Sequence, residues 1–266
     1  MRTEFRHYIH SFKVGSDFLY TLAVDSLCIL LLGFMIAEAG QWIARTAFTI
    51  TGGRSSEELQ TYILSLPAEQ LTAVTGQFRS LALELIAVMV LLPIFALLLF
   101  SLCQMLIWSI LSHKSFSFEK YWKWVVLSFL SIISLFGAFA LLIFTRLLLS
   151  FVTTWDSASG FVLIIILCGF FAINFIICQE FVHSLMIWKS VGHAFTLIAQ
   201  NRKHSLMVFG FGLLTLFVLQ IIQYPFSEQL YFHPQVSLAV QFALFVIWLA
   251  WMRNFVVQSV PKHSPY

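Results

Sequence analysis

Six long apolar stretches limit the fold of this chain more than any other feature. They lie at residues 18–42, 81–111, 121–151, 160–187, 205–224 and 236–257. A helix needs about 20 predominantly apolar residues to cross the hydrocarbon core of a bilayer. Because these stretches do not alternate in polarity as barrel strands do, we expect helices. The sequence therefore predicts an all-α polytopic membrane protein with six transmembrane helices and short interfacial amphipathic helices.

The composition excludes an ordinary soluble domain. Hydrophobic residues make up 60% of the 266 residues, and charged residues make up only 10%. Soluble domains have about 45–50% apolar and about 25% charged residues. With so little charge to cover a surface in water, the chain is expected to form a single transmembrane helical bundle domain over residues 1–266.

The distribution of Lys and Arg predicts the orientation. Of the 15 basic residues, 11 fall in one alternating set of links, and the other four are Arg45, Arg54, Arg79 and Arg146. Links rich in Lys and Arg stay cytoplasmic, so both termini are expected on the cytoplasmic side of the cell membrane. No run of like charges is long enough to bind nucleic acid. The expected partners are membrane lipids or other membrane proteins, and no nucleic acid.

Two segments outside the spans have their own helical patterns. Residues 1–16 carry aromatic and aliphatic residues at helical spacing, which predicts an interfacial helix with its aromatic side chains toward lipid. In the outer segment 45–80, Gly52 and Gly53 break the first helix, and Ser55 with Glu58 forms a capping-box pattern. Because Pro67 suits the start of a helix, we predict two short amphipathic helices over the outer end of the bundle.

Five polar residues fall in the inner third of their spans and are the main candidates for a site: Asp25, Gln104, Glu180, His183 and Arg253. A charge at the bilayer centre is unfavourable by about 2.5–3.5 kcal/mol on insertion scales, so such residues mark candidate sites. One interpretation is a buried structural cluster in which Arg253 balances a carboxylate. A second is a proton- or substrate-handling vestibule open to the cytoplasm. A third is that the side chains simply extend to the interface.

No pattern in the sequence points to a metal, a cofactor or a catalytic centre. Glu180 and His183 have the Glu-x-x-His spacing of di-iron bundles, but such a site needs a second copy and further Glu residues, which the sequence lacks. The four cysteines fall inside predicted spans without ligand spacing. The catalytic signatures of phosphate loops, zinc proteases and nucleophile elbows are missing, so we expect no enzyme. On the outer side, Glu84 and Arg146 are expected to pair for structural reasons.

The link after the fourth span carries a family signal. Glu180 lies near the inner end of that span and precedes an amphipathic segment with Gly192 and Ala194. In this respect the chain resembles a diffuse group of six-span membrane proteins, many of them archaeal. The group includes the membrane domains attached to glycerophosphodiester phosphodiesterases. The resemblance implies no enzymatic activity.

Two functions from different classes follow from these features. The first is a non-enzymatic helix bundle that scaffolds or organises lipids or partner proteins. The second is a small transporter with a cytoplasm-facing polar vestibule around Asp25, Glu180 and His183. Transporters usually contain broken helices at the midplane in matching repeats, whereas here only Pro93 strongly interrupts a span. This difference favours the first function.

Overall fold

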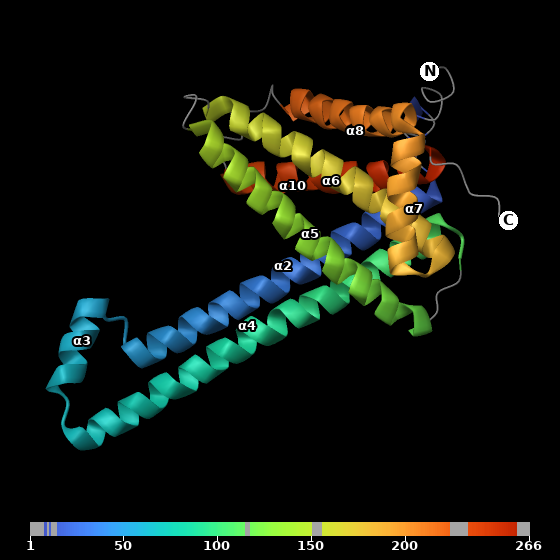
Figure 1. The fold of residues 1–266 in the computed structure, drawn as a ribbon. Coiled ribbons are helices and arrows are strands. Elements are labelled where there is room, and N and C mark those ends of the chain that lie inside the picture. The colour runs from blue at the N-terminus through green and yellow to red at the C-terminus, as the bar shows by residue number, and fades with distance from the viewer. Residues whose placement is uncertain are drawn as a thin grey trace. The chain divides into compact units, whose positions relative to one another are not determined.

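The computed structural model describes residues 8, 9, 11, 15–114, 118–150, 156–223 and 234–259. Within these ranges every regular element is an α-helix, as Figure 1 shows. The helices are α2 (Ser16–Thr51), α3 (Ser56–Ser65), α4 (Ala68–Leu111), α5 (Phe118–Ser150), α6 (Asp156–Ser184), α7 (Ile187–Gln200), α8 (Arg202–Gln223) and α10 (Pro234–Ser259). Six of them, all except α3 and α7, are long and apolar enough to cross a membrane. The predicted all-α polytopic class is confirmed.

The chain divides into two compact units. The first comprises Met1–Ser26 and Ser101–Tyr266, and the second comprises Leu27–Phe100. Helix α2 therefore begins in the first unit and ends in the second, and α4 does the reverse. The single domain over residues 1–266 stays a prediction.

Helix α6 is the centre of the first unit, because it contacts α5, α7, α8 and α10. The core around it is rich in large aromatic side chains, among them Trp108, Phe175, Phe181, Trp248 and Phe255. The second half of α10 is buried on every side, from Trp248 to Val256. A helix that is apolar all round is buried in this way, and a charge on it must find a partner inside the protein.

Gly212 allows α8 and α10 to approach closely. A Cβ atom at this position would lie 3.1 Å from Cys168 Sγ and 3.1 Å from Met252 Cε, closer than side chains normally pack. The Gly212 carbonyl also accepts a hydrogen bond of 3.1 Å from Trp248 Nε1. This close approach fits the use of small residues at helix contacts in membranes.

Tyr8 in the N-terminal segment differs from the prediction that its ring faces lipid. Tyr8 stacks on Phe211 with ring centroids 4.3 Å apart, and its hydroxyl shares a hydrogen bond of 3.2 Å with Thr215. Ser11 is buried and accepts a hydrogen bond from Trp251 Nε1 at 2.9 Å. Tyr8 therefore packs against α8 and α10 and not toward lipid, in a place where its hydroxyl has a hydrogen-bond partner. The other predicted aromatic residues of segment 1–16 lie outside the described residues.

Helix α4 ends before the link to α5 with a left-handed turn of a kind that usually contains glycine, although no glycine is present here. His113 has a φ of 51°, and Lys114 N–H donates to the Ser109 carbonyl at 3.0 Å. The Lys114 ammonium then donates to the Val182 carbonyl at 2.8 Å, near the C-terminal end of α6. Partial burial, assisted by the neighbouring Lys120, lowers the pKa of Lys114. Lys114 thus satisfies one of the free carbonyls of α6.

In the second unit, the break and restart of the helix follow the sequence pattern. Gly52 and Gly53 have φ values of 61° and 73°, which favour glycine, and α2 ends just before them. Ser55 N–H donates to the Glu58 carboxylate at 2.9 Å, and Glu58 N–H donates to Ser55 Oγ at 3.3 Å. This is the predicted capping box, and it begins α3.

The second predicted outer helix does not exist as a separate element. Helix α4 starts at Ala68, directly after Pro67, and continues for 44 residues to Leu111, through Pro93. Residues 68–80 contain no proline and a single glycine, Gly76, which the helix tolerates, so no break separates them from the span that follows. Segment 45–80 thus contains one short helix, α3, between extensions of α2 and α4.

Candidate functional site

An ion pair between two transmembrane helices is the most buried charged feature among the described residues. Arg253 of α10 donates from Nη1 to Asp25 Oδ2 of α2, and the two side chains are only 3% and 7% exposed. The Arg253 guanidinium also lies over the Phe175 ring of α6, 5.1 Å from its centroid. An aromatic face stabilises a desolvated cation. Helices α2, α6 and α10 therefore meet around this ion pair.

The buried polar atoms without a hydrogen-bond partner include one atom of this pair. Arg253 Nε has no hydrogen-bond partner among the described residues, and neither has the side-chain carbonyl oxygen of Gln179 on α6. Gln104 of α4, a predicted member of the cluster, is also buried. An unsatisfied buried polar group is unfavourable by about 1–3 kcal/mol, so each of these atoms lowers the stability of the packed core.

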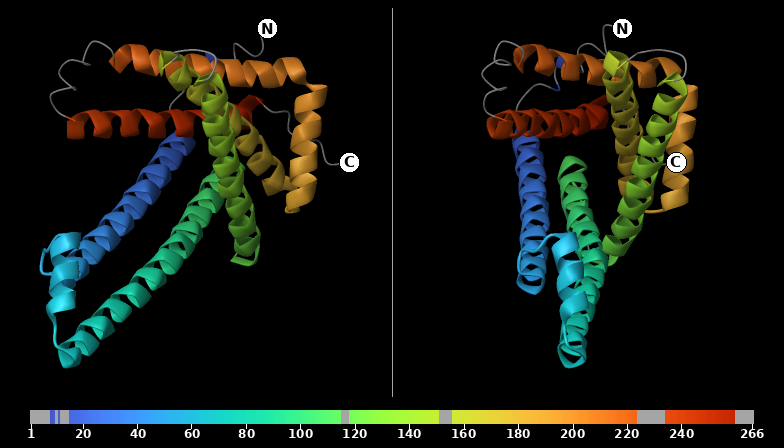
Figure 2. Two further views of the ribbon diagram at one scale, coloured as in Figure 1. Left: turned by 60° about the vertical axis from the view of Figure 1, so that its left-hand side comes forward. Right: turned by 90° about the vertical axis from the view of Figure 1, so that its left-hand side faces the viewer.

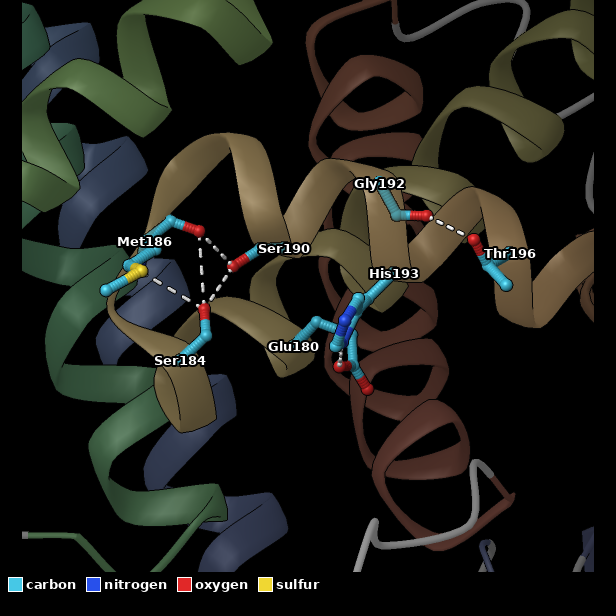
Figure 3. A network of polar contacts seen from close by, with 7 residues as sticks. All are labelled: Glu180, Ser184, Met186, Ser190, Gly192, His193 and Thr196. Atoms are coloured by element: carbon cyan, nitrogen blue, oxygen red, sulfur yellow. Dashed lines mark hydrogen bonds and ion pairs between the residues drawn. The ribbon is translucent and has the colours of Figure 1, made fainter. Parts of the chain in front are cut away.

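Glu180 does not join the pair. Its side chain is 8% exposed, and its carboxylate lies 3.7 Å from Nδ1 of His193, which is on α7 and 51% exposed (Figure 3). The contact exists because the chain reverses after α6 and α7 packs back on it, with Ala194 and Leu197 buried. The reversal passes through Leu185, whose φ of 53° is in the left-handed region.

Hydroxyl groups hold this reversal in place. Ser184 and Ser190 share a hydrogen bond of 2.6 Å, and Ser190 Oγ donates to the Met186 carbonyl at 2.7 Å (Figure 3). Met186 N–H donates to Ser184 Oγ at 3.2 Å. These bonds satisfy backbone groups between the two helices, which would otherwise be open at the turn.

The predicted inner cluster is thus divided in the structure. Asp25 and Arg253 are together, Glu180 faces His193, and His183 is exposed although it follows Glu180 by only three residues. Sequence reasoning missed Phe175 and His193. No pattern marks an aromatic ring as a cation partner, whereas His193 could have been found by folding the amphipathic link back on the fourth span.

The predicted outer pair lies partly outside the described structure. Glu84 is in the second unit, where Ser80 Oγ donates to its carboxylate at 3.2 Å. Both residues line a cavity of about 220 Å³ with Thr46, Thr49 and Gln77. The Arg146 side chain is outside the described residues. The pairing of Glu84 with Arg146 stays a prediction.

Neither metal ligands nor similar proteins specify the class further than the fold does. Within the described ranges, no group of three His, Cys, Asp or Glu side chains is placed to hold a metal ion. No protein family, curated protein or solved structure matches the chain. The fold therefore defines the class: an all-α, multi-pass membrane protein with a buried Asp–Arg pair between its helices. The resemblance to membrane domains of glycerophosphodiester phosphodiesterases stays an expectation.

Proposed function

We propose that this chain is a non-catalytic helix bundle that organises lipids or partner proteins within the membrane. The observation that carries the proposal is the Asp25–Arg253 pair. A carboxylate that relays protons or binds a substrate must exchange with water, whereas Asp25 is buried and already neutralised. The most deeply buried charged pair among the described residues thus joins α2 to α10.

The alternative is a small transporter with an inner polar vestibule. One contact favours it: Glu180 lies near the partly exposed ring of His193, so a proton could pass between the carboxylate and the cytoplasmic link. Of the three residues predicted to form the vestibule, however, Asp25 is paired with Arg253 and His183 points to the surface. The scaffold therefore accounts for more of the polar residues.

Reconstitution separates the two functions. The full chain is placed in liposomes with an imposed pH gradient and potential, and proton entry is followed with an internal pH-sensitive dye. We expect wild-type protein and Glu180→Gln to match protein-free liposomes. Glu58→Gln serves as the control, because Glu58 lies outside the spans. Proton entry that wild type and Glu58→Gln support and Glu180→Gln abolishes would establish the transporter instead.

A further inference from the structure

A groove of about 250 Å³ lies where α6, α7 and α8 meet. Most of its wall is apolar and includes Gly169, Ile173, Ile176 and Phe209. Gly169 and the Phe209 ring face each other across this wall, and a Cβ atom at Gly169 would lie in ordinary contact with the ring at 3.5 Å. The views of Figure 2 show α7 running across the axes of α8 and α10, so this corner lies beside the link between α6 and α8. From the distribution of Lys and Arg we expect that link on the cytoplasmic side.

One end of the groove is cationic. It is lined by Arg202 and Ser205, at the start of α8. Arg202 Nε donates to the Ala199 carbonyl at 3.2 Å, which leaves the two terminal nitrogens of the guanidinium for another acceptor. No carboxylate among the described residues pairs with them. The guanidinium is therefore held at the groove with its donors uncommitted.

The surrounding chain supplies positive charge without acid. Residues 181–227 contain no Asp or Glu, yet they carry three basic residues, Lys189, Arg202 and Lys203. The acidic residue that directly precedes this range in the sequence, Glu180, faces His193. A local excess of Lys and Arg at the inner membrane surface attracts anionic lipid headgroups.

The volume of the groove indicates that it would bind only part of a ligand. Pockets for whole drug-sized molecules measure about 300–1,000 Å³ and enclose most of the ligand. A smaller, apolar groove with one cationic end matches a segment of an amphiphile whose remainder stays in the bilayer. We propose that it binds an acyl chain of an anionic phospholipid of the inner leaflet, with the phosphate on Arg202 and Ser205. This inference rests on the proposed lipid-organising function and gives it a lipid class.

The headgroup contact is tested by charge removal. Purified full-length protein in detergent is titrated with phosphatidylglycerol or phosphatidylcholine, and bound lipid is counted by native mass spectrometry. We expect Arg202→Gln to weaken phosphatidylglycerol binding about fivefold, the effect of one basic side chain at an anionic lipid surface, and to leave phosphatidylcholine unchanged. Lys189→Gln, on the exposed side of α7, is the matched control. Equal losses in the two variants would mean general surface attraction and overturn the site.

The groove itself is tested by filling it. Ile173 lines the groove and is 36% exposed, so Ile173→Trp should occupy the space without displacing the core. Ile164→Trp is the control, because Ile164 is on the same helix, is 39% exposed and does not line the groove. We expect Ile173→Trp to lose one tightly bound phosphatidylglycerol that Ile164→Trp retains. Retention by both variants, or displacement of the lipid by inorganic phosphate, would overturn the proposal.

The two experiments fail separately. If lipid binding is the same in all four variants, the lipid site is wrong. If the liposomes also show no proton entry, the proposed scaffold function still stands. If proton entry depends on Glu180 and phosphatidylglycerol still binds at Arg202, the scaffold function is wrong and the lipid site still stands.

Discussion

At the scale of single residues, Arg253 shows how a charge is retained inside an apolar core. Its carboxylate partner and the Phe175 ring replace water on two sides, but Nε remains without an acceptor. Buried pairs of this kind seldom stabilise a fold more than well-packed apolar residues would, because desolvation offsets the attraction. The pair therefore specifies which helices meet. Removing one of its two residues should destabilise the fold far more than replacing both.

Breaking the pair from one side gives the first prediction. Arg253→Met leaves the Asp25 carboxylate buried and unpaired, which should lower the free energy of unfolding by about 3–5 kcal/mol. Asp25→Val with Arg253→Met should recover much of that loss, since no charge then remains in the core. The measurement is thermal or denaturant unfolding of the full chain in detergent.

Arg45→Met is the control for this series. Arg45 is exposed on α2, and its side chain donates to Gln41 one turn away, so its loss should change stability by no more than about 0.5 kcal/mol. An Arg253→Met protein as stable as Arg45→Met, or a double variant no better than the single one, would contradict a structural role for the pair.

At the scale of elements, local patterns were predictable and long-range ones were not. The capping box of α3 was predictable from Ser55 and Glu58 alone, because its hydrogen bonds join residues three apart. The contact between Glu180 and His193 depends on the reversal at Leu185, a position where sequence reasoning expects glycine or asparagine for a left-handed φ. Because Leu185 is neither, no local pattern marks the reversal, and only the amphipathic pattern of α7 could have indicated that it packs back on α6.

The capping box makes α3 sensitive to acid. Hydrogen bonds from Ser55 N–H and the Ser55 side chain, in that order, lower the pKa of Glu58 below its usual 4.5. A carboxylate with a lowered folded pKa stabilises the helix above its unfolded pKa and stops doing so as the pH falls through the folded value. Hydrogen exchange in residues 55–66, corrected for the chemical exchange rate, should therefore accelerate below about pH 4.5.

Glu58→Ala provides the comparison for α3. It should show the faster exchange already at neutral pH, because the box is lost, and no further change on acidification. An acid transition of the same size in Glu58→Ala would assign the effect to another group.

At the scale of the whole molecule, hydropathy was sufficient for the number of spans but not for their lengths. Helix α2 has 36 residues and α4 has 44, about 54 and 66 Å at 1.5 Å per residue. Even α2, tilted by about 40°, would rise about 41 Å against a hydrocarbon core of about 30 Å. Residues outside the predicted apolar stretches, 43–51 in α2 and 68–80 in α4, continue each helix, because helix propensity and helix-breaking residues, not hydropathy, decide where it ends.

The orientation of these long helices is the last prediction. If both termini are cytoplasmic, the turn at Gly52 and Gly53 lies outside and the link before α5 lies inside. The four native cysteines are buried, so single introduced cysteines report their own positions. In intact cells an impermeant thiol reagent should modify Arg54→Cys and should reach Lys123→Cys only after permeabilisation. Lys123 is chosen because it is exposed, whereas the neighbouring Lys120 lines a cavity with Trp124. The opposite labelling would invert the topology and move the Arg202 groove to the outer leaflet, where anionic lipid is no longer its expected ligand.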